Sequence, residues 1–236
     1  GYPGWHLECA TIIHEELGEP IDIHTGGVDH IPVHHTNEIA QYFAMTGRDL
    51  ARYWLHCGFI TIDDEKISKS LGNTYSLDDL SERGFTAMDY KMWVLSGHSQ
   101  GTRNFTFESL AGAKARRLNW RNRVAECYQR DVPSEAGAFE RIMEAVNDNL
   151  NSPEAFAIID NVVLGLNDWK KIDELFGLQL IADSPDIDDE MRTLIDERQA
   201  AREVKDYAKS DEIRDKLAER RIAVKDTANG PVWQYL

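Results

Sequence analysis

Cysteine is scarce in this sequence, and long apolar runs are absent. The three cysteines, Cys9, Cys57 and Cys127, are odd in number and widely spaced, so they do not form the disulfide framework of a small secreted protein. No run of about 18 apolar residues occurs, and no basic segment followed by an apolar stretch opens the chain. Nothing therefore marks the chain as membrane-spanning or secreted, and we expect a reducing, cytoplasmic location with no membrane partner.

Positive charge is also scarce. The chain has 26 lysine and arginine residues against 41 aspartate and glutamate residues, which gives a formal net charge of −15. Contacts to nucleic-acid phosphates or anionic lipids need local positive charge, so this balance argues against indiscriminate binding to DNA or membranes. It leaves room for a nucleic-acid partner bound through a few basic patches. Apolar residues make up 42% of the 236 residues, which suits a folded protein of roughly two or three domains.

A positively charged loop is predicted at residues 66–70, with the sequence KISKS. The apolar segment before it, residues 59–62, predicts a strand, and the LGN sequence at residues 71–73 predicts a break in the chain. Lys66 and Lys69 would place two ammonium groups on this loop, where they can stabilise charge that develops on a transferring phosphate. A solvated polar turn is the alternative.

Two helices are predicted before this loop. The spacing of apolar residues predicts one helix from Trp5 to Gly18 and a second that begins at Val33 and ends at Gly47. Each helix therefore ends at a glycine.

A short strand is predicted between these helices, at residues 20–24, followed by a turn that contains Gly27 and Asp29. In a parallel sheet, a strand that ends in a glycine turn with an aspartate can hold a nucleotide at the carboxyl edge. Most turns of this composition have no such role, so the pattern alone does not decide between a nucleotide-binding turn and an ordinary turn.

A metal site is a second possibility in this region. His34 and Glu38 are four residues apart, so in a helix their side chains lie on one face, about one turn apart. Together with Cys9 they offer a thiolate, an imidazole and a carboxylate, all of which zinc accepts. The alternative is that Cys9 is a small buried hydrophobic residue and that the other two form an ordinary surface pair.

Several motifs, in order, give the chain a family resemblance. They are the opening PGWHxEC, the segment GGxDxxxxHHxNEIAQ from Gly26, KxSKSLGN from Lys66 and LSGH from Leu95. Their order and spacing resemble cysteinyl-tRNA synthetases, and KISKS resembles the KMSKS signature of class I aminoacyl-tRNA synthetases, with Ile67 in place of methionine. The later segments DNLNSPEA and SDEIRDKL resemble the same family, so the resemblance covers essentially the whole chain.

The resemblance implies a two-step reaction. Cysteine and ATP, with Mg²⁺, would form cysteinyl-adenylate and pyrophosphate, and the cysteinyl group would then move to the end of tRNA(Cys). Lys66 and Lys69 would act on the phosphates, with Lys69 in direct contact with ATP. Gly27 and Asp29 would bind the nucleotide, the aspartate by accepting hydrogen bonds from a ribose.

The resemblance also implies one zinc ion per intact subunit, held by Cys9, His34, Glu38 and a further cysteine that is absent from the chain. Apolar fit separates near-isosteric substrates by only about a hundredfold, whereas zinc with an open position binds a thiolate strongly and an alcohol poorly. The metal would thus select L-cysteine over serine. Trp5, one helical turn before Cys9, would wall the amino-acid pocket, with core packing as the alternative, and His35 would have a supporting role.

Part of the family pattern has no counterpart among these residues. The HIGH signature, the fourth zinc-binding cysteine and the first half of the nucleotide-binding fold are not found, and the chain begins at Gly1 without a methionine. We therefore interpret it as the second half of such an enzyme, monomeric when intact. Alone, residues 1–236 are expected neither to activate cysteine nor to hold zinc tightly.

The expected fold is α/β followed by all-α. Residues 1–104 would form the second half of a class I Rossmann-like catalytic domain, residues 105–182 a helical bundle, and residues 183–236 a small mixed anticodon-binding module. Helices are predicted over residues 107–128, 133–150 and 153–176, and a helix pair followed by a hairpin closes the chain.

The C-terminal module is the expected contact to tRNA. Its helix pair carries many arginines and lysines that could meet phosphates, and an aromatic side chain could stack on an unpaired base. The residues assigned to this role are Arg202, Arg214, Arg221, Asp226 and Trp233. The alternative is a solvated helix pair whose charges pair with each other one turn apart.

Two other functions stay open. The cysteine ligase of mycothiol synthesis shares the zinc and KMSKS regions but needs no anticodon module, so the helical stretch after Phe107 favours the synthetase. A truncated paralogue that binds zinc or RNA without catalysis is also compatible with these motifs.

Overall fold

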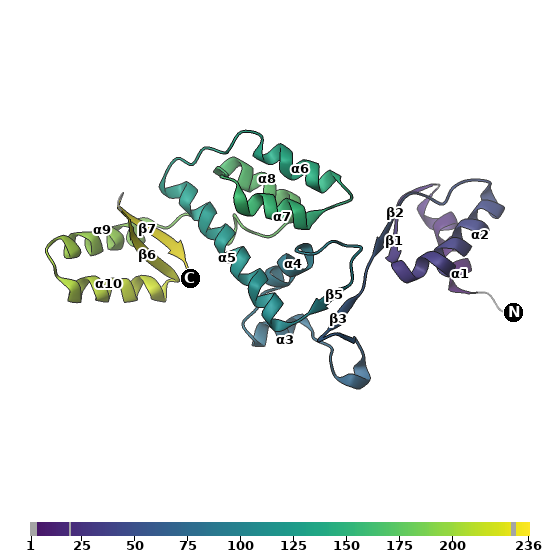
Figure 1. Cartoon of the computed structure of the whole chain (residues 1–236), viewed down its shortest axis with the longest axis horizontal. Helices are drawn as coiled ribbons and strands as arrows, with labels where there is room; N and C mark the ends of the chain where they lie inside the picture. Colours follow the sequence, from purple (N-terminus) through teal and green to yellow (C-terminus); the bar gives the residue numbers. More distant parts are fainter. Residues whose placement is uncertain (1–3, 19, 228–229) are drawn as a thin grey trace. The chain divides into compact units, whose positions relative to one another are not determined.

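A computed structural model of the chain describes residues 4–18, 20–227 and 230–236, without the side chain of Lys69. The chain forms two compact units: an N-terminal unit of residues 1–74 and 97–106, and a helical unit of residues 75–96 and 107–236. The described residues are mostly helical, with small two- and three-stranded sheets (Figure 1). None of their helices is long and apolar enough to span a membrane.

The N-terminal unit combines two helices with short strands. In chain order it contains α1 (Trp5–Ile12), the π-helical turn η1 (Ile13–Leu17), β1 (Ile21–Gly27), the 3-10 turn η2 (Val28–His30), the π-helical turn η3 (Ile31–His35), α2 (Thr36–Thr46), β2 (Ala51–Cys57), β3 (Ile60–Ile62), β4 (Glu65–Lys66), the 3-10 turn η4 (Lys69–Leu71) and β5 (Arg103–Phe105). Helices α1 and α2 pack against each other, and β1 pairs with β2 in parallel.

The helical unit contains two short helices, a long helix, three helices of the bundle and the C-terminal module. In chain order these are α3 (Leu77–Glu82), α4 (Ala87–Leu95), α5 (Phe107–Gln129), α6 (Ala138–Asn147), α7 (Ser152–Asn161), α8 (Leu166–Phe176), α9 (Asp189–Glu203), α10 (Tyr207–Glu219), β6 (Ile222–Thr227) and β7 (Gly230–Tyr235). The predicted helix pair and closing hairpin are thus confirmed, with β6 and β7 antiparallel.

Both predicted helix ends in the N-terminal unit are confirmed. Gly18 follows η1 with φ 81°, and Gly47 follows α2 with φ 69° in the left-handed region. Residues with a Cβ rarely adopt this backbone conformation, which is why glycine commonly ends a helix. Within the unit, the small core of buried residues consists of Ile13, Tyr42, Leu50 and Ala51.

The predicted end of the first strand is wrong. Strand β1 does not stop at residue 24 but pairs with β2 through both glycines, up to Gly27 opposite Cys57. A Cβ on Gly26 would lie 2.6 Å from a ring atom of His35 and 2.7 Å from Nδ1 of His30. The glycine is needed for close packing against these rings and not for a turn.

The KISKS segment forms a closed bend that is only partly the predicted loop. Lys66 lies in β4, opposite Thr61 of β3, and the following residues turn as η4. Asn73 joins the two ends of the bend: its Oδ1 accepts a hydrogen bond from the backbone N–H of Ser68 at 2.8 Å, and its Nδ2 donates to the carbonyl of Lys66 at 3.1 Å. The asparagine of the LGN sequence therefore holds the bend that carries the two lysines.

The helical unit is organised around α5, which spans 23 residues (Figure 1). Trp120 is fully buried on this helix and packs against Phe156 and Trp169, with ring centroids 4.8 Å and 5.9 Å apart. Helix α4 packs on α5 through Trp93, whose Nε1–H donates to Ser109 Oγ at 2.8 Å. Trp93 is buried at this contact.

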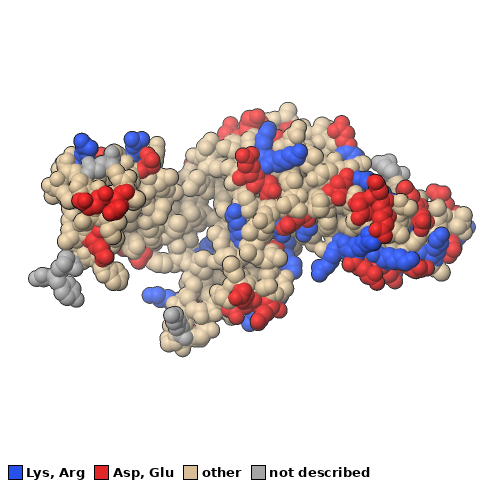
Figure 2. Space-filling model, turned by 180° about the vertical axis from the view of Figure 1, so that it is seen from behind, with Lys and Arg blue, Asp and Glu red and all other residues tan. Residues whose placement is uncertain are grey.

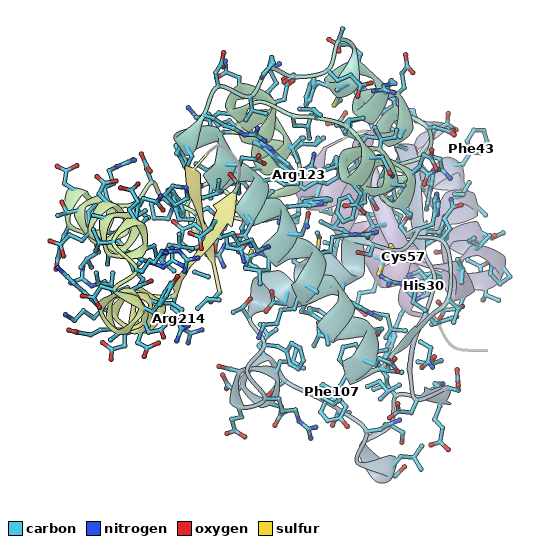
Figure 3. All side chains as sticks on the ribbon, turned by 60° about the vertical axis from the view of Figure 1, so that its left-hand side comes forward. His30, Phe43, Cys57, Phe107, Arg123 and Arg214 are labelled. Atoms are coloured by element: carbon cyan, nitrogen blue, oxygen red, sulfur yellow. The ribbon has the colours of Figure 1, made fainter. Side chains whose placement is uncertain are left out.

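The single helix predicted over residues 153–176 is wrong, because the structure divides it into α7 and α8. Val162 is extended, with φ −104° and ψ 156°. Arg123, which extends from α5 and is labelled in Figure 3, donates to the carbonyl of Ile159 at 2.6 Å and to that of Val162. The guanidinium thus satisfies carbonyls at the end of α7 that otherwise lack an intrahelical partner.

The C-terminal module is joined to α5 by two amide side chains. Gln129 accepts from the backbone N–H of Trp233 and donates to its carbonyl, both at 2.9 Å. Asn122 makes the same pair of contacts to Tyr235, at 2.7 Å and 3.3 Å. The structure groups residues 183–236 with the bundle, and residues 75–96 as well, in one compact unit. The division into three domains stays a prediction.

Candidate functional site

Cys9, His34 and Glu38 come together in the N-terminal unit. Cys9 lies on α1, His34 on η3 and Glu38 in the first turn of α2, and their thiol, imidazole and carboxylate atoms lie within 4.8 Å of one another. The Nε2 atom of His34 is 3.7 Å from Oε1 of Glu38. The helical spacing that motivated the prediction therefore places both side chains on the face toward Cys9. That these atoms bind a metal stays a prediction.

Glu38 is the most constrained of the three side chains. It is completely buried, and its Oε2 lies 2.9 Å from Nε2 of His24. Its other oxygen, Oε1, is buried and has no hydrogen-bond partner among the described residues. A buried polar atom without a partner costs about 1–3 kcal/mol, so the surroundings of Oε1 fit a cation as its partner.

The donor set fits zinc, which accepts thiolate, imidazole and carboxylate ligands. Nitrogen and oxygen ligands of one tetrahedral zinc lie about 3.3 Å apart, and the 3.7 Å between Nε2 of His34 and Oε1 of Glu38 is somewhat longer than this. Burial and the negative charges of Glu38 and Glu8 raise the pKa of the Cys9 thiol. A metal ion would therefore have to displace a proton from Cys9 in order to bind.

Four histidines form a group around Glu38, and of these only His35 was given a role from the sequence. Its members are His24 on β1, His30 on η2 (labelled in Figure 3), His35 on η3 and His56 on β2. Eight histidines occur in the chain and five of them fall within residues 24–56, a clustering that is the available sequence signal. His24 on β1 and His56 on β2 are brought close together only by the parallel pairing of the two strands, in which His24 is opposite Trp54.

His35 is the buried member of this group. Its Nδ1 lies 2.8 Å from Nε2 of His56. Burial, followed by the neighbouring His24, lowers the pKa of His35 to about 4. The ring is therefore neutral near neutral pH, and the supporting role expected for it stays a prediction.

Gly27 and Asp29 lie where β1 ends. A Cβ on Gly27 would be 2.3 Å from Oδ1 of Asp29, so the carboxylate folds back over the glycine. The Asp29 side chain is exposed at the edge of the sheet where β1 and β2 both end. The position agrees with the carboxyl-edge location that motivated the prediction, and the nucleotide contact itself stays untested.

Of the two lysines of the KISKS segment, the structure describes the side chain of Lys66 but only the backbone of Lys69. Lys66 is exposed on β4. The backbone of Lys69 begins η4, but its side chain lies outside the described atoms. The predicted phosphate contacts of both lysines stay predictions.

Trp5 is not a core residue. Its side chain is 81% exposed, which excludes the core-packing alternative within the described structure. It lines a shallow surface depression together with Leu7 and Ile12, and helical spacing places it on the same side of α1 as Cys9. A role as a wall of an amino-acid pocket stays a prediction.

The positive charges of the C-terminal module are largely paired. Figure 2 shows lysine and arginine side chains next to aspartates and glutamates over this part of the chain. The pairs are Arg202 with Asp226, Arg214 with Asp211 and Asp215, Lys216 with Glu212, and Arg220 with Glu190. Arg221 is exposed and has no ion-pair partner among the described residues. The helix pair therefore matches the solvated, charge-paired alternative more closely than a continuous basic face.

Two of the residues assigned to tRNA have structural roles instead. Trp233 is 4% exposed and belongs to the core of the C-terminal module, so the prediction that its ring stacks on a base is wrong: neither face is open. Asp226 accepts two hydrogen bonds from Arg198. Its carboxylate is thus already paired within the module, although the side chain is partly exposed.

Comparison with known proteins connects these features. Residues 1–115 match the family model described as tRNA synthetases class I (C) catalytic domain, and residues 184–233 match that of the cysteinyl-tRNA ligase anticodon binding domain. Cysteine–tRNA ligases of Treponema denticola and Shouchella clausii are 35% and 36% identical to the chain over 279 and 266 aligned residues. These alignments include 100% and 99% of the chain and, in each case, 57% of the relative.

The chain belongs to the cysteine–tRNA ligase family. It spans about half the length of the curated relatives it matches. Among solved structures, a LeuRS–tRNA–LeuAMS complex of Agrobacterium radiobacter aligns with a TM-score of 0.45 and 17% identity, covering 69% of this chain and 24% of that one.

Each of the two family matches contains a different set of the candidate functional residues. The catalytic-domain match contains the Cys9–His34–Glu38 cluster and the KISKS bend, and the anticodon-domain match contains α9, α10 and most of the hairpin. A match in the C-terminal module supports a ligase of this family over the cysteine ligase of mycothiol synthesis, which needs no such module.

Proposed function

We propose that the chain provides the zinc site, the KMSKS-like bend and the anticodon-binding module of an enzyme that joins L-cysteine to tRNA(Cys) with ATP. The observation that carries the proposal is the convergence of Cys9, His34 and Glu38 around a buried carboxylate oxygen that has no other partner among the described residues. An ordinary surface pair has no reason to bury such an atom.

Cys9, His34 and Glu38 would hold the metal. Zinc bound there would supply an open position that takes a substrate thiolate far more readily than an alcohol, and so would select cysteine over serine. The chain's own contribution is to keep the three donor atoms close together on α1, η3 and α2. Trp5, exposed on the same side of α1 as Cys9, would cover the substrate side chain.

The nucleotide would lie along the carboxyl edge of β1 and β2. Asp29 would accept hydrogen bonds from the ribose, and Gly27 leaves the space into which that carboxylate folds. Lys66 and Lys69 would lie over the phosphates, where their charge offsets the negative charge that grows as pyrophosphate leaves. The Mg²⁺ that accompanies ATP would neutralise the same oxygens.

The C-terminal module would contact tRNA through cations and not through Trp233. Arg221 is the strongest candidate for a phosphate contact, because a cation that already has an intramolecular partner must give it up first. Arg202 and Arg214 are partly exposed and paired with carboxylates, so they could exchange these partners for phosphates.

The test is ATP–pyrophosphate exchange by the protein expressed at its full natural length. Exchange that depends on cysteine and is not supported by serine is expected, together with cysteinylation of tRNA(Cys). Cysteine-dependent exchange without any charging of tRNA would favour a cysteine ligase with another acceptor. No cysteine-dependent exchange from a protein that binds zinc and tRNA would favour the non-catalytic paralogue.

A further inference from the structure

The two oxygens of Glu38 have different surroundings. Oε2 is 2.9 Å from Nε2 of His24, whereas Oε1 lies 3.7 Å from Nε2 of His34 and has no hydrogen-bond partner among the described residues. A carboxylate can only accept hydrogen bonds, so the 2.9 Å contact requires that Nε2 of His24 carries the proton. One oxygen is thus engaged by a donor, and the other is directed toward the proposed metal ligands.

His24 is itself held in place. Its ring lies 4.8 Å from that of Trp54, edge to face at 79°, and 4.8 Å from that of His35. Trp54 belongs to β2 and His35 to η3, so neither neighbour is part of α2, the helix that carries Glu38. His24 and Trp54 are opposite each other in the parallel register of β1 and β2. The sheet therefore fixes the orientation of the donor that contacts Glu38.

His24, His35 and Glu38 also have ligand atoms within 4.8 Å of one another, which raises the question of a second metal site. The separation of His24 and Glu38 argues against it. Two ligands bound to one tetrahedral zinc through N and O atoms lie about 3.3 Å apart, and 2.9 Å is the length of a direct hydrogen bond. A protonated Nε2 also has no lone pair to offer a metal.

We propose that His24 is a positioning residue, which holds Oε2 of Glu38 by a hydrogen bond so that Oε1 faces Cys9 and His34 as a metal ligand. This inference rests on the proposed function, because it presumes that the three residues bind zinc. Without the donor, the buried carboxylate would lose its one hydrogen-bond partner among the described residues and keep only the longer contacts to His34 and His35, at 3.7 Å and 3.8 Å. Partners that orient a metal ligand in this way typically contribute about 10–100-fold to metal affinity.

The experiment measures metal affinity by competition with a chromophoric chelator, for Zn²⁺ and for Co²⁺, in the protein at its full natural length. His24→Leu removes the donor and should weaken binding about 10–100-fold. His24→Gln keeps an amide N–H near the position of Nε2 and should restore most of the affinity. His98→Gln, which removes a histidine elsewhere in the N-terminal unit, is the matched control and should bind as the unsubstituted protein does.

A double-mutant cycle separates positioning from a general structural effect. If His24 acts through Glu38, the pair His24→Leu and Glu38→Gln should bind metal no more weakly than Glu38→Gln alone. The Co²⁺ absorption spectra of His24→Leu and Glu38→Gln should also change in the same way. Additive losses of affinity would overturn the proposal, as would a His24→Leu variant that binds metal as tightly as the unsubstituted protein.

Two further outcomes have separate meanings. Two metal ions per chain, one of which is lost in His24→Leu, would overturn the positioning role and make His24 a ligand of a second site. Unchanged metal binding in Cys9→Ala would instead contradict the proposed zinc site itself. Unfolding measured with the metal removed shows whether His24→Leu folds. If it does not fold, the metal affinity of His24→Gln is compared with that of the unsubstituted protein instead.

Discussion

Arg198 on α9 and Asp226 on β6 form a two-pronged ion pair, with Nη1 2.8 Å from Oδ1 and Nη2 3.1 Å from Oδ2. The guanidinium is almost fully buried, whereas the carboxylate is partly exposed. The pair joins the helix pair to the hairpin, and Arg202 contacts the same carboxylate at 3.3 Å. A residue assigned to tRNA from the sequence is therefore a structural link of the C-terminal module.

Replacing Asp226 with Asn should destabilise this module. The substitution leaves the buried guanidinium of Arg198 without its counter-charge, and after allowance for the partial exposure of the carboxylate we expect a loss of about 1–2 kcal/mol in the free energy of unfolding. Urea unfolding followed by tryptophan fluorescence measures it. Asp215→Asn, which removes an exposed partner of Arg214, is the control, and equal stability of the two variants would contradict the structural role.

The same pair predicts a dependence of stability on pH. The hydrogen bonds from Arg198 lower the pKa of Asp226 below its usual range. A carboxyl whose pKa is lower in the folded state stabilises the protein above its unfolded pKa, about 3.9, and this contribution disappears as the pH falls through the folded value. The stability difference between the unsubstituted protein and Asp226→Asn should therefore be largest near neutral pH and shrink below about pH 4. A difference that grows on acidification would contradict this assignment.

Removal of the Cys9 thiol should abolish stoichiometric zinc. The test uses the protein at its full natural length, where the expected site has four protein ligands and the Cys9 thiolate is one of the three that this chain supplies. Elemental analysis of Cys9→Ala, after dialysis against a weak chelator, makes the comparison. Cys127→Ala is the control, because Cys127 lies on α5 in the other unit. A full complement of zinc in Cys9→Ala would remove Cys9 from the site.

Loss of the Lys69 ammonium should slow adenylate formation. Charge grows on the phosphates in the transition state, so Lys69→Ala in the full-length enzyme should reduce ATP–pyrophosphate exchange by about 10²–10³. Cysteine binding should change little, because the thiol would bind at the Cys9 cluster. The matched control is Lys170→Ala on α8. An exchange rate equal to that of the unsubstituted enzyme would exclude the phosphate role.

A change in salt dependence should identify the phosphate contacts of the C-terminal module. Each phosphate contact contributes roughly one unit to the slope of log affinity against log salt concentration. Arg221→Ala should lower the slope by about one unit, and Arg220→Ala, which removes the partner of Glu190, should lower it less. Titration of tRNA(Cys) at several salt concentrations provides the slopes. Identical slopes for Arg221→Ala and the unsubstituted protein would exclude this contact.

Local rules account for what was predicted well. Gly18 and Gly47 end their helices, and His34 lies near Glu38 because a helix brings residues four apart together. Each of these relationships depends on backbone geometry within a few residues. The motifs that resemble the family are likewise visible without any tertiary contact.

The sequence by itself therefore determined where two helices end, the closing helix pair and hairpin, the family and the candidate ligands Cys9, His34 and Glu38. Only the tertiary structure decided that His24 contacts Glu38, that Trp233 is buried and that Arg123 ends α7 at Val162. These contacts join residues on different elements. They follow from the register of a sheet and the packing of helices, in which one side chain selects among partners that are distant along the chain.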